Sequence, residues 1–254
     1  MERVEVERVK YTIRACETIE ELVALVKIQR QIWGYAKHEV YPLRLFVTLR
    51  KIGGQVLGAF TPRGALVGFV ASLPAWHGAD RYYHSLSLGV LRAHENRGLG
   101  RALKMAQRRE ALRAGIGLIE WTFDPLRAKN AFLNIVRLGA IARCYQPDYY
   151  GEVGSRFQRG LPSDRLIAEW HLSSIRVKRA IAGKPPRPSN AQPVATLEIP
   201  ADIDGLRQAN RAEARRRQLA VRQQLQDYFA EKLAITGFEY DVRSARYLLD
   251  PYED

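Results

Sequence analysis

The sequence predicts an α+β fold built on a mixed, mostly antiparallel sheet flanked by helices. Segments with the alternating pattern of strands exchange along the chain with segments of helical spacing. Two strand segments, 55–60 and 65–73, are joined by Thr-Pro-Arg-Gly, whose proline and glycine are typical of a tight hairpin turn. An apolar strand that ends at Val90 leads through a glycine-containing turn into a helix that begins near Gly98. These three observations indicate strands and helices that alternate within one sheet.

The segments before the hairpin are predicted to be a strand and a helix. Residues 10–15 alternate as a strand does. Thr18, followed three residues later by Glu21, has the capping-box spacing that opens a helix. Residues 34–49 are mixed and aromatic and are expected to form a helical connection.

The middle of the chain continues the alternation. After the hairpin, residues 82–90 alternate as a strand, and the helix that follows is expected to end at Gly115. Residues 117–123 form the next predicted strand, and residues 126–138 have helical spacing up to Gly139. Strands over 140–145 and 165–171, separated by a long loop, complete the set.

The composition changes at a proline-rich stretch after this sheet. Residues 183–192 are predicted to be an exposed linker between a domain over 1–182 and a C-terminal extension over 193–254. The extension is predicted to be strand, helix, strand, with the helix over 202–233 and the closing strand over 238–249. An extension this small is not expected to fold alone, so we expect it to pack on the first domain or on a second subunit of a homodimer.

Composition limits the kinds of protein this can be. With 254 residues, 46% of them hydrophobic, the chain can bury a sizeable core. It has no apolar run near the ~20 residues of a membrane span, and its charged first ten residues do not resemble a secretory signal. Cys16 and Cys144 lie far apart, which predicts a cytoplasmic protein without a cysteine metal site. The net charge of +13 is spread along the chain, so nucleic acid is not expected to be its main partner.

The turn before the helix at Gly98 has the chemistry of a phosphate site. Backbone N–H groups in the first turn of a helix lack partners within the helix, and the helix dipole favours an anion there. Gly98 and Gly100 allow a ligand to approach the backbone closely, and Arg97 and Arg101 add positive charge. The Walker loop and the dinucleotide fingerprint are both excluded, because the residues that each requires are missing.

The run Arg-Gly-Leu-Gly-Arg-Ala at 97–102 resembles the R/Q-x-x-G-x-G/A loop that binds acyl-CoA pyrophosphate in the GNAT N-acyltransferase superfamily. The resemblance extends over about residues 11–171. It implies the GNAT fold, an acyl-CoA donor, pyrophosphate on the backbone N–H groups of residues 99–102 and pantetheine along the preceding strand, with a backbone N–H near Leu88 as oxyanion donor. The implied cofactor-binding residues are Leu88, Gly89, Val90, Arg97, Gly98, Leu99, Gly100, Arg101, Ala102 and Asn130, with Asn134 as the alternative to Asn130.

Transfer to an amine also requires a base, because an ammonium must lose a proton before it attacks. Glu120 and His84 are the candidates. Many GNAT enzymes carry a tyrosine that protonates the leaving thiolate, but alignment on Gly139 places Ile135 at that position. Tyr145 or Tyr149 is therefore expected to replace it, unless the thiolate leaves without a dedicated acid.

A narrower resemblance concerns the acceptor. The series WTFDPL, NAFLN, LGA, YYG and LPSDRL is similar to GNAT proteins associated with N-acylamino-acid racemases. This resemblance implies acetyl-CoA or succinyl-CoA as donor, no metal, and a small amine, foremost an amino acid, as acceptor. The proposed substrate-binding residues are Asp124, Arg127 and Tyr149, and Arg127, Arg159 and Arg165 are candidates to pair with a carboxylate. The alternatives are a basic nucleic-acid or ribosome-binding module and a protein N-acetyltransferase.

Overall fold

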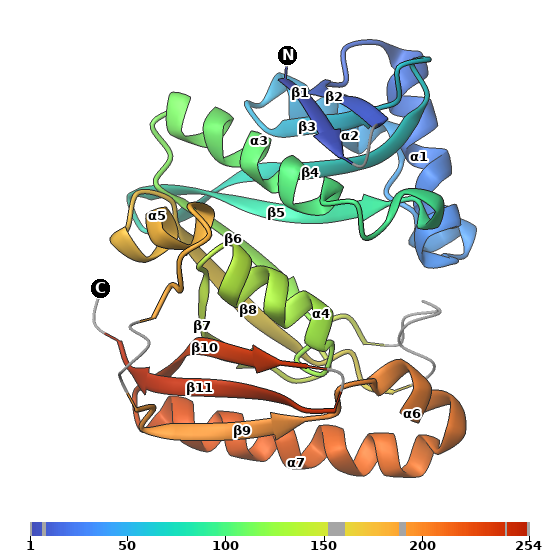
Figure 1. Cartoon of the computed structure of the whole chain (residues 1–254). Coiled ribbons are helices and arrows are strands. Elements are labelled where there is room, and N and C mark those ends of the chain that lie inside the picture. The colour runs from blue at the N-terminus through green and yellow to red at the C-terminus, as the bar shows by residue number, and fades with distance from the viewer. Residues whose placement is uncertain (1, 7–8, 152–160, 188–191, 242, 253–254) are drawn as a thin grey trace. The chain divides into compact units, whose positions relative to one another are not determined.

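A computed structural model describes residues 2–6, 9–151, 161–187, 192–241 and 243–252 (Figure 1). The chain divides into two compact units, the first running to Ile119 and the second beginning at Glu120. Strand β6 (Leu118–Phe123) carries the chain from the first unit into the second.

The first unit is an antiparallel sheet covered by helices on both faces. Its strand order is β1-β2-β3-β4-β5, and each neighbouring pair is antiparallel. The strands are β1 (Glu2–Val6), β2 (Val9–Ala15), β3 (Gln55–Phe60), β4 (Leu66–His77) and β5 (Asp80–Val90). The helices are α1 (Ile19–Trp33), α2 (Leu43–Lys51), α3 (Leu99–Arg113) and the short 3-10 turns η1 (Lys37–Glu39) and η2 (Arg92–His94).

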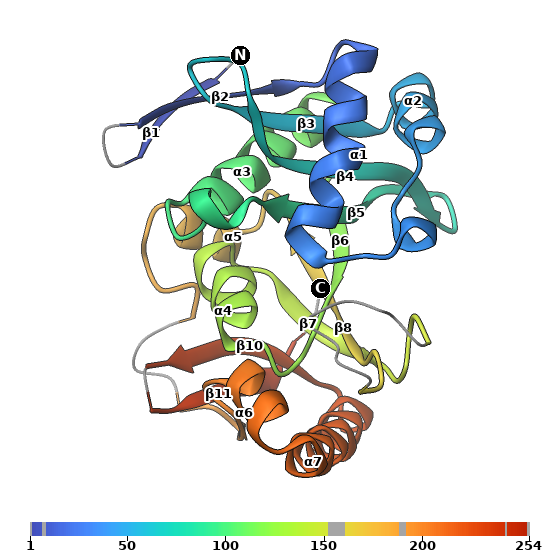
Figure 2. The ribbon, with the colours of Figure 1, turned by 90° about the vertical axis from the view of Figure 1, so that its right-hand side faces the viewer.

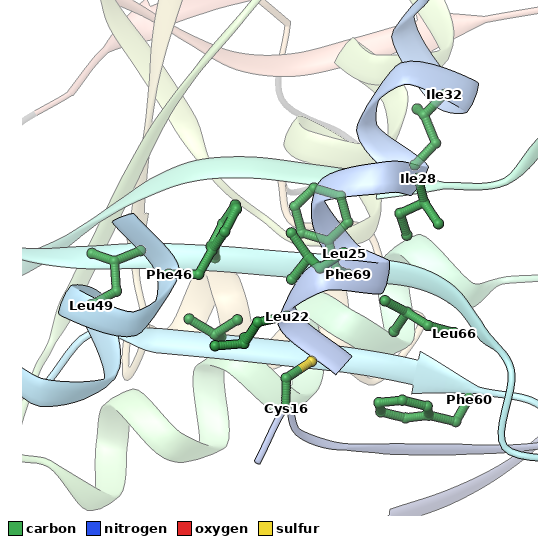
Figure 3. Packing of buried hydrophobic residues seen from close by; sticks show 12 residues of the cluster. Cys16, Leu22, Leu25, Ile28, Ile32, Phe46, Leu49, Phe60, Leu66 and Phe69 are labelled. Carbon is green, nitrogen blue, oxygen red and sulfur yellow. The ribbon is translucent and has the colours of Figure 1, made fainter. Parts of the chain in front are cut away.

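Alternation along the strands divides the core of this unit between the two faces of the sheet. Leu22, Leu25 and Phe46 of α1 and α2 form one buried cluster with Phe69 of β4 (Figure 3). Leu103 of α3 belongs to a second cluster, with residues of β2, β3 and β4. The two clusters match the arrangement in Figure 2, where α1 and α3 lie on opposite sides of β4.

The predicted capping box at the start of α1 is present and supports a pH prediction. Arg14 donates to Glu21 at 2.5 Å, and the N–H groups of Glu17 and Thr18 also donate to this carboxylate. The hydrogen bond from Arg14, against some opposition from burial, lowers the pKa of Glu21 to about 2. Because the folded pKa lies below the unfolded value, this stabilisation is complete above about pH 4.3 and is lost as the pH falls toward 2. We expect Glu21→Gln to lower the melting temperature at pH 6 and to differ little from the wild type at pH 2, with Glu198→Gln as the control.

The second unit is a sheet with the strand order β6-β8-β7-β10-β11-β9. Its further strands are β7 (Ile141–Gln146), β8 (Arg165–His171), β9 (Ala195–Ile199), β10 (Leu233–Tyr240) and β11 (Ala245–Pro251). Its helices are α4 (Ala128–Ala131), the π-helix η3 (Phe132–Arg137), α5 (Ile175–Ile181), α6 (Ile203–Ala209) and α7 (Arg211–Ala230). In Figure 1, α7 runs along the strands of residues 195–251.

The extension over residues 193–254 belongs to this second unit and continues its sheet. Strand β10 pairs with β7 through Ile235 and Ala142, and β11 and β9 follow outward. The division into compact units falls between Ile119 and Glu120, and the domain boundary at the proline-rich linker stays a prediction. Within the second unit, the extension packs on the segment before the linker.

The predicted secondary structure of the extension was wrong in two places. The single helix expected over 202–233 is two helices, because Asn210 leaves the helical conformation and its side chain caps α7 by accepting from Glu213. The closing strand expected over 238–249 is a hairpin, β10 and β11, and Gly237 lies at an irregularity inside β10. Strand β1 and helix α5 have no counterpart in the sequence prediction.

Gly139, which was predicted to end a helix, follows the π-helix with a positive φ of 77°. A Cβ there would lie 2.9 Å from Cβ of Ala180 and 3.1 Å from the Arg176 carbonyl oxygen. Gly183 has the same φ, but a Cβ would meet nothing within 4 Å. We expect Gly183→Ala to cost about 1–2 kcal/mol of unfolding free energy from backbone strain, and Gly139→Ala to cost more, because α5 must also move. Urea unfolding of both variants tests this, and equal losses would contradict the packing argument.

Within the described ranges, no helix is both long and apolar enough to cross a membrane.

Candidate active site

The phosphate site predicted at the start of α3 has the backbone geometry that such a site needs. Gly98 precedes the helix in the left-handed conformation, with φ 73° and ψ 0°, and no side chain caps the first turn. The N–H of Ala102 donates to the Gly98 carbonyl oxygen at 3.0 Å, so Ala102 is not a donor for a ligand. The N–H groups of Leu99 and Gly100 come earlier in the turn and have no partner within the helix.

Space around the two glycines fits a ligand that approaches the backbone. A Cβ at Gly98 would meet nothing within 4 Å, and a Cβ at Gly100 would meet only Cδ2 of Leu88, at 3.7 Å. The contact also places the first turn of α3 beside Leu88 on β5, the strand predicted to bind pantetheine. The residues present therefore fit a phosphate-bearing cofactor with an extended arm.

The loop into α3 is held by an interaction that sequence reasoning missed. The Tyr11 hydroxyl on β2 and Nδ1 of His94 lie 2.8 Å apart, and the two rings meet edge to face. Burial, and then the positive charge of Arg97, lower the pKa of His94. Asn96 has a φ of 59°, so two residues of this loop, Asn96 and Gly98, adopt the left-handed conformation. Arg97 and Arg101 are both half-buried beside this turn.

The predicted pantetheine strand is part of the β4–β5 ladder. Leu88, Gly89 and Val90 pair with Val70, Phe69 and Gly68 of β4. A Cβ at Gly89 would lie 2.8 Å from the side chains of Ile32 and Trp33, so the packing of α1 on the sheet already requires a glycine there.

His84, a candidate base, lies on β5 and is half-buried. Burial, and then the charge of Lys104, lower its pKa, so His84 is neutral near pH 7 and able to accept a proton. Lys104 itself is buried in α3, where it lies 3.1 Å from Ser85 Oγ and 2.9 Å from Gln107 Oε1. This buried polar cluster was also missed, because Lys104 stands on the helix face that the apolar spacing assigns to the core.

The other candidate base, Glu120, lies on β6 in the second unit with 9% of its surface exposed. Glu120 and Thr122 stand two residues apart on a strand and therefore share a face of the sheet. The Thr122 hydroxyl is 2.8 Å from the hydroxyl of Tyr150, whose ring packs edge to face against Tyr149 with centroids 4.7 Å apart. Both tyrosines are exposed, and the guanidinium of Arg165 lies 5.1 Å from the centre of the Tyr150 ring.

Tyr145 is poorly placed to act as the acid. Its hydroxyl donates to Asp164 Oδ2 at 2.7 Å, and the side chain is 7% exposed. Burial, with the hydrogen bond to Asp164, raises the pKa of Tyr145 far above its usual value. This geometry supports a structural role for Tyr145, whereas Tyr149 is exposed.

Two of the predicted substrate-binding residues are paired with the extension. Asp124 accepts the N–H of Leu126 at 2.9 Å and forms an ion pair with Arg207 of α6, also at 2.9 Å. Arg127 pairs with Asp204 of the same helix at 3.0 Å. Both side chains thus hold the loop after β6 to α6, which argues for a structural role of Asp124 over a contact with the acceptor.

The helix expected over 126–138 is short and becomes a π-helix from Phe132. Asn130 is exposed and lies in α4, whereas Asn134 is 5% exposed and lies in the π-helix. Ile135 is completely buried, in agreement with a core position where the family tyrosine would stand. Because π-helical turns often occur at functional sites, Asn134 is as strong a cofactor candidate as Asn130. Arg159 lies outside the described residues.

Three consecutive arginines, Arg215 to Arg217, lie on α7 and are partly neutralised within that helix. Arg216 and Arg217 both pair with Glu213, at 2.7 and 2.9 Å. Arginines that share one carboxylate in this way are typical of a solvated helix face. This pairing weakens the alternative that the chain is a nucleic-acid-binding module.

Comparison with known proteins bears on the family and the fold. Residues 22–133 match the acetyltransferase (GNAT) family model. No curated protein matches the sequence. Among solved structures, the chain is similar to a GNAT-family acetyltransferase protein from Desulfovibrio desulfuricans, with a TM-score of 0.52, 15% identity and coverage of 64% of this chain and 99% of that chain. It is also similar to the ribosomal-protein-S18-alanine N-acetyltransferase from Escherichia coli, with a TM-score of 0.51, 18% identity and coverage of 65% and 95%. A GNAT-family acetyltransferase from Streptococcus pneumoniae gives a TM-score of 0.50, 15% identity and coverage of 63% and 98%. The predicted α+β fold with a mostly antiparallel sheet is thus confirmed as the GNAT fold.

Proposed function

We propose that this chain, whose residues 22–133 match the GNAT acetyltransferase family model, uses an acyl-CoA donor and transfers an acetyl or succinyl group to the amine of a small acceptor, foremost an amino acid. The uncapped first turn of α3 carries the proposal, because Gly98 and Gly100 leave its backbone open to a phosphate. The acyl-CoA supplies an activated thioester carbonyl when it is bound. The racemase-associated subgroup has no support beyond the sequence resemblance.

The residues of the first unit bind and orient the donor in this proposal. The N–H groups of Leu99 and Gly100 donate to the pyrophosphate, and Arg97 and Arg101 balance its charge. Leu88 lies against the same turn, so a ligand bound at the helix can continue along β5.

Residues of β6 and of the loop after β7 are the acceptor-binding residues in this proposal. Glu120 accepts a proton from the acceptor ammonium, which gives the neutral amine that attacks the carbonyl carbon. The carbon–sulfur bond of the thioester then breaks, and the second proton that the nitrogen loses goes to the departing thiolate, directly or through water, so that CoA leaves as the thiol. Thr122 stands on the same face as Glu120 and is joined to Tyr150, so an acceptor amine above Glu120 has its substituent beside the pair Tyr149 and Tyr150. An exposed aromatic pair suits an acceptor with an apolar or aromatic substituent.

A thiol-release assay tests the transfer. Acetyl-CoA and succinyl-CoA are each offered with D- and L-amino acids, with simple amines and with short peptides that have free N-termini. Release of CoA that depends on an amino acid supports the proposal. If only the peptides increase the release of CoA, the chain is instead a protein N-acetyltransferase. If none of the acceptors increases the release of CoA, transfer to an amine is refuted.

The role of Glu120 has its own test. We expect Glu120→Gln to lower kcat by about 100-fold or more, because general-base catalysis contributes roughly 10²–10⁴-fold, and to leave acetyl-CoA binding intact. The remaining activity should rise with pH as more acceptor becomes neutral. His84→Asn is the matched variant for the other candidate base. A large loss in His84→Asn with little loss in Glu120→Gln would exchange the two assignments.

A further inference from the structure

The C-terminal extension holds the loop that carries the exposed tyrosines, through one buried carboxylate. Asp164 lies just before β8 and is 1% exposed. Its Oδ2 accepts from the Tyr145 hydroxyl at 2.7 Å and from Nε of Arg222 at 3.0 Å. Its Oδ1 accepts from the Asp148 backbone N–H at 2.9 Å and from Nη2 of Arg222 at 2.6 Å. Four hydrogen bonds thus converge on this carboxylate, and two come from one guanidinium of α7.

The residue next to Asp164 fixes the backbone of the tyrosines. The N–H of Tyr149 donates to the Ser163 carbonyl oxygen at 3.1 Å, and the N–H of Tyr150 donates to Ser163 Oγ at 2.8 Å. The N–H of Ser163 donates back to Asp148 Oδ1 at 2.9 Å. Tyr149 and Tyr150 are 43% and 45% exposed, so two large aromatic side chains are presented to solvent on a tightly bonded backbone. This pair is called the tyrosine wall below.

We propose that Arg222 is a positioning residue for the acceptor, because it holds Asp164 and through it the tyrosine wall. This proposal rests on the proposed function, from which it takes the contact between the tyrosine wall and the acceptor. Arg222 belongs to the extension and lies far along the chain from every motif that indicated the family.

The physical argument concerns the burial of Asp164. A carboxylate this deeply buried keeps its charge only if that charge is paired and hydrogen-bonded. Burial acts to raise the pKa of Asp164, but the hydrogen bonds from Arg222, Asp148 and Tyr145 leave it lower than usual. Without the guanidinium, the carboxylate must take up a proton or turn toward water. Turning toward water breaks its bond to the Asp148 N–H, at the residue that precedes the wall.

Arg222→Met tests this, with Arg215→Met, an exposed change on the same helix, as the matched control. Hydrogen exchange of residues 145–151 reports the order of the wall without any need for activity. We expect Arg222→Met to speed this exchange, to raise the acceptor KM by about tenfold or more, since small misplacements can cost up to ~100-fold, and to leave acetyl-CoA affinity unchanged. The double variant Arg222→Met/Asp164→Asn removes the unpaired charge and should restore part of the protection and part of the acceptor KM.

The outcomes separate this proposal from its alternatives. A lower melting temperature with unchanged exchange and unchanged acceptor KM would show that Arg222 is only structural, and equal effects in Arg215→Met would also overturn the proposal. Faster exchange with an unchanged acceptor KM would mean that the tyrosine wall does not receive the acceptor. If the wild type releases no CoA with any acceptor, the proposed function fails, while the exchange comparison still decides whether Arg222 orders the wall.

Discussion

Gly100→Trp is expected to abolish the thermal stabilisation of this protein by acetyl-CoA. A ligand at 100 times its Kd stabilises the folded state by about 2.7 kcal/mol, which corresponds to about 5–10 °C for a chain of this size. An indole at Gly100 would occupy the space between the first turn of α3 and Leu88. A Cβ at Gly100 would have one neighbour within 4 Å there, Cδ2 of Leu88 at 3.7 Å. Without this space the phosphate cannot reach the backbone N–H groups, and the shift should vanish.

Two further variants keep this result interpretable. Gly117→Trp places the same side chain at another glycine with open surroundings and no positive φ, and it should keep the ligand-induced shift. Gly100→Ala adds only a methyl group in the first turn of a helix, where alanine is favoured over glycine by up to ~1 kcal/mol. It should therefore match or exceed the wild-type stability without ligand while binding acetyl-CoA more weakly. Melting curves with and without acetyl-CoA measure both effects, and a full shift in Gly100→Trp would remove the phosphate site from α3.

The sequence was sufficient for the first turn of α3 because the chemistry there is local. A glycine that must adopt a left-handed conformation, a second glycine two residues later and an apolar helical face all lie within one continuous stretch. The helix begins at Leu99, within one residue of the prediction, and Gly98 has the expected backbone freedom. The predicted set of N–H donors needs correction, since the Ala102 N–H is bonded to the Gly98 carbonyl oxygen.

The paired side chains of the second unit could not be predicted in the same way. Asp124 and Arg127 looked like ligand contacts because a charged residue after a strand has no visible partner in the sequence. Their partners, Arg207 and Asp204, lie 83 and 77 residues further along the chain. No periodicity or spacing rule connects residues so distant, and the extension had not been placed beside this loop.

The break between α6 and α7 is a local feature that hydrophobic spacing did not predict. Hydrophobic spacing over 202–233 is compatible with one long helix, but Asn210 can cap a new helix with its own side chain. Asp204 and Arg207 stand three residues apart on α6, and both pair with the loop after β6. The capping side chain of Asn210 therefore accounts for a break that the apolar pattern alone does not predict.

The same ion pairs give the second large effect, which is expected in Arg207→Met. Arg207 has 1% and Asp124 10% of its side chain exposed, so removal of the guanidinium leaves a carboxylate in a nearly dry site. Breaking a buried pair from one side costs about 3–5 kcal/mol. We expect a loss of this size in urea unfolding, with the first increase in hydrogen exchange at residues 124–127.

The double variant Arg207→Met/Asp124→Asn distinguishes an unpaired charge from a simple loss of packing. The amide that replaces the Asp124 carboxylate would be neutral and could still accept the N–H of Leu126 through its carbonyl oxygen, so the turn after β6 would keep its cap. Replacing both partners of a buried pair is often close to neutral. The double variant should therefore be more stable than Arg207→Met alone, although it carries one more substitution. If the double variant loses as much unfolding free energy as Arg207→Met and Asp124→Asn together, the stabilisation comes from packing of the aliphatic part of the Arg207 side chain. The ion pair then does not hold α6 to the loop.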